Sequence, residues 1–159
     1  MNKGYLAGFI EGEGCFMVNV SGGIGGPQFV IGLRDDDRVI LEEIKSVLQT
    51  NVNVLVYHER GVQHPAAFLS IGGLDDCMRL IEFLDDNPFK GKKRPQYEIW
   101  KKAVYYHRRN KIVGRHNKDL AKRKYAQMLV YHNQLRQLKR YKVPDGHNGF
   151  RQTRLSAFL

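Results

Sequence analysis

The stretch YLAGFIEGEG, residues 5–14, decides the fold of this chain. Three apolar side chains recur in it at helical spacing and can point into a core: Leu6, Phe9 and Ile10. A second helical face carries small residues at every fourth position: Gly4, Gly8 and Gly12, with Ala7 beside them. Each glycine inside a helix costs about 1 kcal/mol relative to alanine, so a helix with three of them needs a reason. Close approach of another backbone is the usual one, and a second copy of the same helix would place a two-fold axis through the contact.

Glu13 lies where Gly12 and Gly14 are expected to end this helix. Two copies of the chain would therefore hold two Glu13 carboxylates close together at the end of a symmetric pair of helices. From these residues alone, the leading interpretation is a short helix at an interface. A carboxylate site at the end of that helix is the alternative.

Length and composition predict one domain that is neither secreted nor membrane-spanning. The chain has 159 residues, of which 42% are apolar, enough for a core. No apolar run approaches the roughly 18 residues of a membrane span, and the N-terminus lacks the apolar segment of a signal peptide. Cys15 and Cys77 fit a reduced interior better than a disulfide framework, and no cysteine or histidine spacing indicates zinc.

The charge of the chain is divided unevenly between its two halves. Residues 1–89 contain 6 Lys and Arg against 13 Asp and Glu, a net charge of −7. Residues 90–159 contain 20 Lys and Arg against 3 Asp and Glu, a net charge of +17. A half with this much positive charge predicts a polyanionic partner, with nucleic acid ahead of an anionic membrane surface.

The hydrophobic pattern predicts an α+β fold. Strands are predicted over residues 15–20, 28–34, 52–59 and 66–71. After the opening helix, further helices are predicted over residues 35–49, 74–84, 96–107 and 118–142. The resulting order begins helix, strand, strand, helix, strand, strand, helix. A four-stranded antiparallel sheet with its helices on one face would leave the other face open.

Three sequence patterns could each indicate a functional site, but other features of the sequence argue against all three. The glycine-rich segment 21–27 joins two strands and lacks a following Gly-Lys-Ser/Thr, so a hairpin tip is favoured over a phosphate loop. The acidic run 35–37 is expected to cap a helix rather than to bind a metal. The three His-Asn pairs lack further ligands at set spacing, so all six histidines are interpreted as surface, core or phosphate-contacting residues.

The nine residues from Leu6 to Gly14 resemble the signature of the LAGLIDADG homing endonucleases, with glutamate in both acidic positions. The order of helices and strands through about residue 107 is also the order found in this family. The resemblance implies a site-specific DNA endonuclease that hydrolyses phosphodiester bonds with Mg²⁺, for which Mn²⁺ can substitute. One signature per chain implies a homodimer, a long pseudo-palindromic target and a double-strand break with 3′ overhangs. The resemblance also implies that the gene lies inside an intron or intein. The protein is then expected to be intracellular, in a prokaryotic cytoplasm or an organelle.

The resemblance assigns roles within the signature helix. Glu13 and the Gly12 carbonyl are expected to bind the metal at the scissile phosphate, while Glu11 is assigned either a catalytic or a structural role. The dimer interface is assigned to the small residues of the helix: Gly4, Ala7, Gly8 and Gly12.

The resemblance also assigns a catalytic lysine and a DNA-binding surface. The lysine near the scissile phosphate is expected to be Lys92, with Lys90 or Lys93 as alternatives, because a compact charge there stabilises the phosphate. Base contacts are expected from alternate residues of the strands: Asn19, Gln28, Val30, Arg34, Tyr57, Glu59 and Phe68. Phosphate contacts are expected from basic residues: Arg34, Arg38, Arg60, Lys90, Lys93 and Arg94.

One departure from the family pattern concerns the residues that order water. Family members often place a glutamine and an arginine near the end of the second strand, at positions that Leu33 and Asp37 occupy here. Neither residue can do that work, and Arg34 or Arg38 is the expected substitute.

By these interpretations the chain comprises an endonuclease core at 1–107, a basic helical extension at 108–143 and a tail at 144–159. Three other functions fit the same fold. An intron maturase would bind RNA, a regulator would bind DNA or RNA without cutting it, and a structural dimer would do neither.

Overall fold

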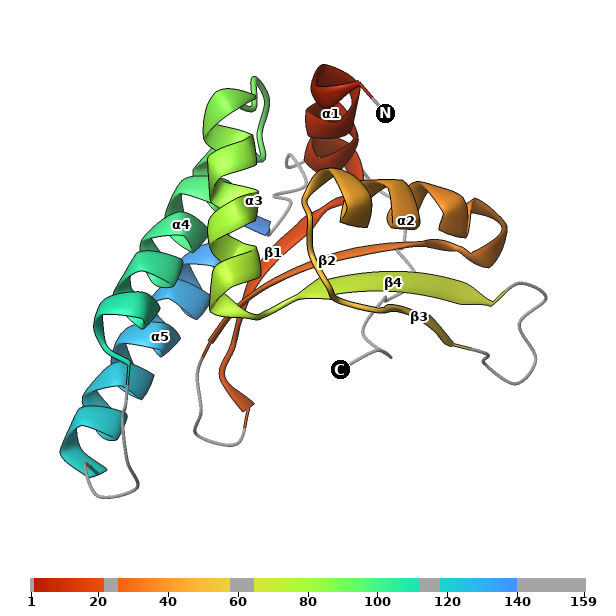
Figure 1. The fold of residues 1–159 in the computed structure, drawn as a ribbon. Helices are drawn as coiled ribbons and strands as arrows, with labels where there is room; N and C mark the ends of the chain where they lie inside the picture. The colour runs from red at the N-terminus through yellow and green to blue at the C-terminus, as the bar shows by residue number, and fades with distance from the viewer. Residues whose placement is uncertain (1, 22–25, 58–64, 112–117, 140–159) are drawn as a thin grey trace, which may run out of the picture.

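The helices and strands alternate as predicted, in the order α-β-β-α-β-β-α followed by two C-terminal helices (Figure 1). The structure is a computed structural model that describes residues 2–21, 26–57, 65–111 and 118–139. Its elements are α1 (Lys3–Glu13), β1 (Cys15–Asn19), β2 (Gly26–Arg34), η2 (Asp35–Asp37), α2 (Arg38–Val47), β3 (Val54–Tyr57), β4 (Ala66–Ile71), α3 (Leu74–Asp86), α4 (Arg94–Arg109) and α5 (Lys118–Lys139).

The four strands form one antiparallel sheet in the order β1-β2-β4-β3. Buried and less buried residues alternate along β2 and β4, because successive side chains of a strand point to opposite faces. Helices α1, α2 and α3 lie over one face (Figure 1), and the buried residues of the strands point toward them. In the part of the chain that the structure describes, α1, α2 and α3 leave the opposite face of the sheet uncovered, as predicted.

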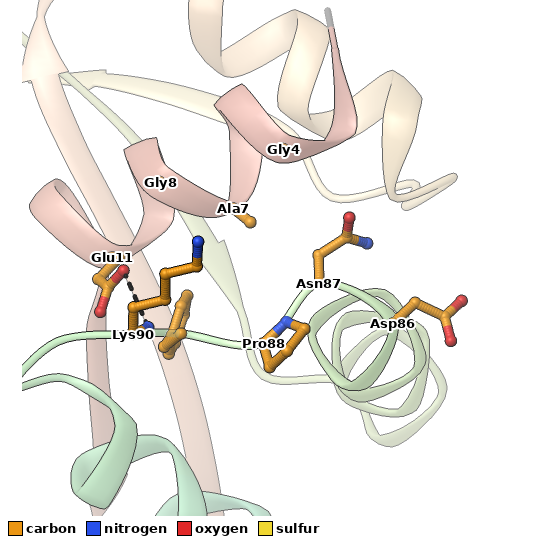
Figure 2. A pocket seen from close by; sticks show the side chains of 9 residues that line it. Gly4, Ala7, Gly8, Glu11, Asp86, Asn87, Pro88 and Lys90 are labelled. Carbon is orange, nitrogen blue, oxygen red and sulfur yellow. Dashed lines mark hydrogen bonds between the residues drawn. The ribbon is translucent and has the colours of Figure 1, made fainter.

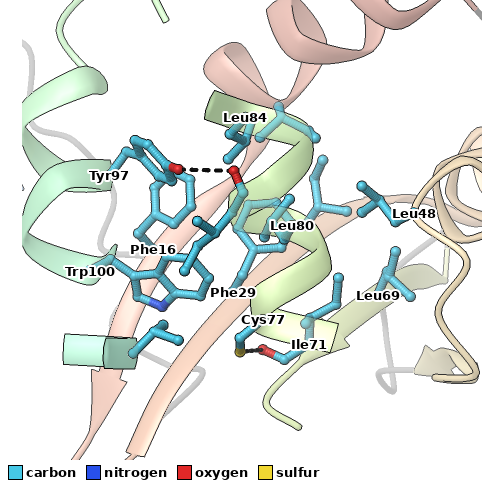
Figure 3. Packing of buried hydrophobic residues seen from close by; sticks show 14 of the residues in the cluster. Phe16, Phe29, Leu48, Leu69, Ile71, Cys77, Leu80, Leu84, Tyr97 and Trp100 are labelled. Carbon is cyan, nitrogen blue, oxygen red and sulfur yellow. Dashed lines mark hydrogen bonds between the residues drawn. The ribbon is translucent and has the colours of Figure 1, made fainter. Parts of the chain in front are cut away.

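An aromatic cluster fills the space between the sheet and the helices that cover it (Figure 3). Phe16 lies at its centre, with its ring centroid 5.2 Å from those of both Phe29 and Trp100 and 5.6 Å from that of Tyr97. Aromatic pairs at such separations stabilise a core beyond the area that they bury. This cluster joins β1 and β2 to α4 and fixes the start of α4 relative to the end of α1.

A polar contact joins α3 to α4 beside that cluster. The Tyr97 hydroxyl donates to Asp85 Oδ1 at 2.6 Å, and Lys101 Nζ lies 2.6 Å from both Asp85 carboxylate oxygens. Burial opposes the ionised form of Asp85, but the hydrogen bonds from Lys101 and Tyr97 outweigh it and lower the pKa of the carboxyl group. The turn between α3 and α4, which reaches α1, is thus held at both of its ends.

Helix α5 packs on α4 and along the free edge of β1. Met128 and Leu135 are buried, and His132 Nδ1 lies 2.8 Å from the Val18 carbonyl oxygen. Leu129 and Leu138 lie outside this packed row and are 38% and 44% exposed.

Three predictions about element ends were wrong. Residues 35–37 form the short helix η2, and no side chain caps η2 or α2. Instead, the Asp35 N–H donates to the Pro65 carbonyl at 2.9 Å, and Asp36 pairs with Arg34 at 2.6 Å. Helix α4 continues through Arg109, two residues beyond its predicted end at residue 107. Strand β3 begins at Val54, two residues after the predicted start. Residues 58–59 of that predicted strand and the predicted tail lie outside the described residues.

Candidate active site and nucleic-acid interface

Helix α1 is anchored at its beginning and along one side. The Asn2 side chain caps it by accepting a hydrogen bond from the Gly4 N–H at 2.8 Å. Leu6 and Ile10, one turn apart, are fully buried in the core. The opposite side of the helix is consequently held at a fixed position above the sheet.

The glycine-bearing side of α1 is not packed against any other described part of the chain. Gly4, Gly8 and Gly12 are exposed, and a Cβ atom added at Gly8 or Gly12 would meet no atom within 4 Å. Beside this side lies a shallow pocket of about 470 Å³ between α1 and the turn at residues 86–90 (Figure 2). The folded chain therefore does not explain why glycine occupies two interior helix positions.

The end of α1 is sharply defined by Gly14. Its N–H donates to the Ile10 carbonyl at 2.9 Å, and an added Cβ would lie 2.6 Å from the Phe29 ring. Only a residue without a side chain allows the helix to turn here into β1. The exposed Glu13 carboxylate is thereby fixed beside the start of the sheet.

Both acidic residues of the signature lie in the last turn of α1, where the helix dipole disfavours negative charge. Glu11 has a structural explanation, because its carboxylate accepts a hydrogen bond from the Gly91 N–H at 2.5 Å. It accepts a weaker one from the Lys90 N–H at 3.5 Å, which Figure 2 shows. A Cβ at Gly91 would lie 2.9 Å from Glu11 Oε1, so the turn approaches α1 as closely as it can. Glu13 makes no described hydrogen bond or ion pair, and the fold alone gives no reason for its charge.

Lys93 brings a positive charge to the same end of α1. Its ammonium group donates to the Gly12 carbonyl at 3.1 Å and to the Gly14 carbonyl at 2.5 Å. Burial lowers the pKa of this lysine, while the nearby Glu13 carboxylate acts in the opposite direction. Lys92, the first choice from sequence, is exposed and makes no described polar contact. The geometry favours Lys93, the alternative, as the lysine nearest to the predicted site.

The open face of the sheet carries six of the seven strand residues expected to contact bases. The pairing register places these six on the same side of the sheet: Asn19, Gln28, Val30, Arg34, Tyr57 and Phe68. The seventh, Glu59, lies outside the described residues. Gln28 Nε2 donates to Ser70 Oγ at 2.6 Å across the strands. The Tyr57 and Phe68 rings meet edge to face at 5.6 Å, and Phe68 lies over Gly32, where a Cβ would come within 2.5 Å of its ring.

The basic residues expected to contact phosphates are more scattered. Lys90 and Arg94 are exposed around the turn into α4, and Arg38 opens α2, where it lies 3.8 Å from Glu42. Arg34 is on the open face but is paired with Asp36, and Arg60 lies outside the described residues. Leu33 points to the covered face, so it cannot order water on the open one.

The sequence model of the LAGLIDADG endonucleases matches residues 6–104, more than half of the chain. The chain belongs to the LAGLIDADG endonuclease family. Its fold matches that of meganuclease I-AabMI bound to uncleaved DNA, with a TM-score of 0.64 and 28% identity, over 83% of this chain and 44% of that one. It matches homing endonuclease I-TnaI with a TM-score of 0.66 and 19% identity, over 87% of this chain and 95% of that one.

A third LAGLIDADG structure, I-SmaMI bound to an uncleaved DNA target in the presence of calcium ions, matches with a TM-score of 0.67 and 16% identity. The match covers 86% of this chain and 45% of I-SmaMI. The chain therefore spans less than half the length of I-AabMI and I-SmaMI. A search of curated protein sequences found no match. In the part of the chain that the structure describes, no helix is long and apolar enough to cross a membrane.

The donor atoms at the end of the LAGLIDADG helix are of the kind that a hard divalent cation takes as ligands. Among the described residues, no group of three or more His, Cys, Asp and Glu gathers within one chain. Glu13 offers carboxylate oxygens, and the Gly12 carbonyl retains a second lone pair beside its bond to Lys93. Mg²⁺ is commonly held by one or two carboxylates together with waters and phosphate oxygens. The described residues of one chain thus supply part of such a site.

Proposed function

We propose that this LAGLIDADG chain is a site-specific DNA endonuclease that acts as a homodimer. The observation that carries the proposal is the end of α1, at the edge of an open antiparallel sheet. An exposed Glu13, with no hydrogen bond or ion pair to any described residue, lies there close to Lys93. A carboxylate against the helix dipole and a half-buried lysine both cost stability. Such local costs are typical of a functional site.

The empty surroundings of Gly8 and Gly12 support the homodimer. Small residues allow two helix backbones to approach closely, and among the described residues of this chain none makes that approach. Two chains related by a two-fold axis along α1 would bring two Glu13 carboxylates together. The match to less than half of I-AabMI supports the same conclusion, because that longer chain has room for two such units.

The proposed reaction is hydrolysis of one phosphodiester bond in each DNA strand. Glu13 and the Gly12 carbonyl would hold Mg²⁺, or Mn²⁺ in its place, and the cation would polarise the phosphate and acidify a bound water. The Lys93 ammonium, fixed by two backbone carbonyls, would stabilise the charge that develops on the phosphate oxygens. Two Glu13 sites at one two-fold axis would place the cuts across one minor groove and leave 3′ overhangs.

The open face of the sheet would read the target in the major groove. The amide groups of Asn19 and Gln28 can pair with adenine, and Arg34 can pair with guanine or phosphate. Tyr57 and Phe68 form an apolar surface on which Tyr57 is 57% exposed. Such a surface suits the methyl groups of thymine. A two-fold protein predicts a roughly palindromic target.

Cleavage of a randomised duplex library tests the proposal. The full chain is incubated with the library in Mg²⁺ or in Ca²⁺, the new ends are sequenced, and Glu13→Gln serves as the control. We expect paired cuts at one pseudo-palindromic site in Mg²⁺ and none with Glu13→Gln. Tight, salt-sensitive binding without any cut in Mg²⁺ or Mn²⁺ would overturn the proposal in favour of a regulator. Sedimentation as a species near 18.4 kDa under cleavage conditions would overturn the homodimer.

A further inference from the structure

The last residue of α5, Lys139, reaches the end of the LAGLIDADG helix from a part of the chain beyond the family match. Its ammonium group lies 3.1 Å from Cys15 Sγ. Cys15 opens β1 two residues after Glu13, and its side chain belongs to the open face, opposite Val30. Lys139 therefore stands on the face proposed to bind DNA, next to the proposed metal ligand.

The position of Lys139 is set by the packing of α5. Leu135, one turn earlier, is 2% exposed, and two turns earlier His132 contacts the Val18 carbonyl. From His132 to Lys139 the helix rises about 10.5 Å, and from Val18 back to Cys15 the strand covers about 10 Å. Helix α5 thus runs antiparallel to β1 with matched spacing, and its last turn meets the first residue of the strand.

Lys139 and Lys93 contact neighbouring residues at the start of β1. Lys93 Nζ donates to the Gly14 carbonyl at 2.5 Å, and Lys139 Nζ lies 3.1 Å from Sγ of Cys15, the next residue. No carboxylate among the described residues lies within ion-pair distance of Lys139, which has a thiol as its polar neighbour. Two lysines gathered in this way repel each other until an anion lies between them. The fold therefore provides a place for a negative group at the start of β1.

We propose that Lys139 is a second lysine of the cleavage site and contacts the same scissile phosphodiester as Lys93. This inference rests on the proposed endonuclease function. In the reaction, the oxygen of water bonds to phosphorus and the bond from phosphorus to the leaving oxygen breaks. The water loses a proton to solvent, and the leaving oxygen takes one up. Lys139 keeps its own proton and stabilises the charge that develops on the phosphate oxygens. The helix beyond the family match would thus complete the active site.

The test separates the cleavage step from binding. The variant Lys139→Met keeps the apolar stem and removes the charge, and Lys139→Arg restores a charge. Lys122→Met is the matched control, because Lys122 is an exposed lysine of the same helix about 26 Å along its axis from Lys139. Single-turnover cleavage is measured in Mg²⁺ with enzyme in excess over a duplex carrying the site recovered from the library. Affinity for the same duplex is measured separately in Ca²⁺, and thermal unfolding reports on the fold.

We expect Lys139→Met to lower the cleavage rate constant at saturation by about 100-fold. Lys139→Arg should recover most of that loss, and Lys122→Met should cleave at the wild-type rate. A loss below tenfold in Lys139→Met would overturn the inference even if affinity fell, since Lys139 would then be an ordinary phosphate contact. An equal loss in Lys139→Arg, accompanied by a lower Tm, would overturn it in favour of a structural role. A wild-type chain that cuts no duplex would overturn the proposed function and this inference with it.

Discussion

The two sides of α1 differ in burial and in how well their residues suit a helix. On one side, Leu6 and Ile10 are fully buried, and their positions are explained by the core that they fill. On the other, Gly8, Gly12 and Glu13 are exposed, and each is a poor choice for the helix that carries it. The buried side explains why the chain folds, and the exposed side indicates what the folded chain is for. Mutations on the two sides should therefore have separable effects.

The largest effect is expected from Glu13→Gln, which removes a charge and leaves the size of the side chain unchanged. We expect DNA cleavage to fall by about 10³-fold or more. The Tm should stay the same or rise slightly, because a negative charge leaves the end of the helix dipole. Single-turnover cleavage and thermal unfolding of the same preparation check both parts. Cleavage at the wild-type rate would remove Glu13 from the proposed site.

Ile10→Ala should act in the opposite way, on stability. Removing a fully buried isoleucine side chain is expected to cost about 2–5 kcal/mol in the free energy of unfolding. Urea unfolding followed by circular dichroism measures the loss. The molecules that remain folded should retain an unchanged Glu13 site, so cleavage per folded molecule should stay near the wild-type value. A loss below about 1 kcal/mol would show that this side of α1 is not the anchored one.

Gly8→Ala should separate folding from association within a single substitution. An added Cβ meets no atom within 4 Å in the chain, so alanine should stabilise the helix by about 1 kcal/mol. The same methyl group should hold two copies of α1 apart and weaken the homodimer. Sedimentation equilibrium and unfolding at low concentration measure the two effects. A dimer of unchanged affinity would show that this side of α1 is not the interface.

Gly14→Ala is the matched control for Gly8→Ala. Its Cβ would lie 2.6 Å from both the Ile10 carbonyl oxygen and the Phe29 ring. We therefore expect a lower Tm, where Gly8→Ala raises it. Equal Tm shifts in the two variants would contradict the distinction between an open and a packed glycine.

The smallest effect is expected at the contact between α3 and α4. Hydrogen bonds from Lys101 and Tyr97 lower the pKa of Asp85 when the chain folds. Asp85 therefore stabilises the folded chain at pH values above its unfolded pKa of about 3.9. This stabilisation is lost as the pH falls through the lower folded pKa. Because the Asp85 side chain is 42% exposed, the contribution should be small. The Tm difference between wild type and Asp85→Asn should shrink from pH 7 to pH 3. A constant difference would assign the effect to the uncharged part of the contact.

The fold was predictable because its signals are local. The spacing of Leu6, Phe9 and Ile10 and the alternation in β4 depend on residues that are close in sequence. The capping role of residues 35–37 was wrong because Asp35 instead contacts Pro65, which lies 30 residues further along the chain. A contact between residues so far apart in the chain cannot be predicted from a local sequence pattern.

The site was predictable in part, for the same reason. The signature locates Glu13 and Gly12 directly. It does not choose between Lys92 and Lys93, because neighbouring residues of a turn point in different directions and only the path of the backbone decides which ammonium reaches α1. The approach of Lys139 to Cys15 spans 124 residues and depends on how α5 packs. The sequence indicated only a basic residue near the end of a long helix, and not the contact that this residue makes.

The position of α5 along β1 also bears on how the chain avoids aggregation. The outer strands of a sheet present unpaired backbone groups to which other chains can add. Helix α5 covers β1, and His132 lies within hydrogen-bonding distance of one of its carbonyl groups. A chain proposed to pair with its own copy through a helix thus offers little opportunity to pair through β1.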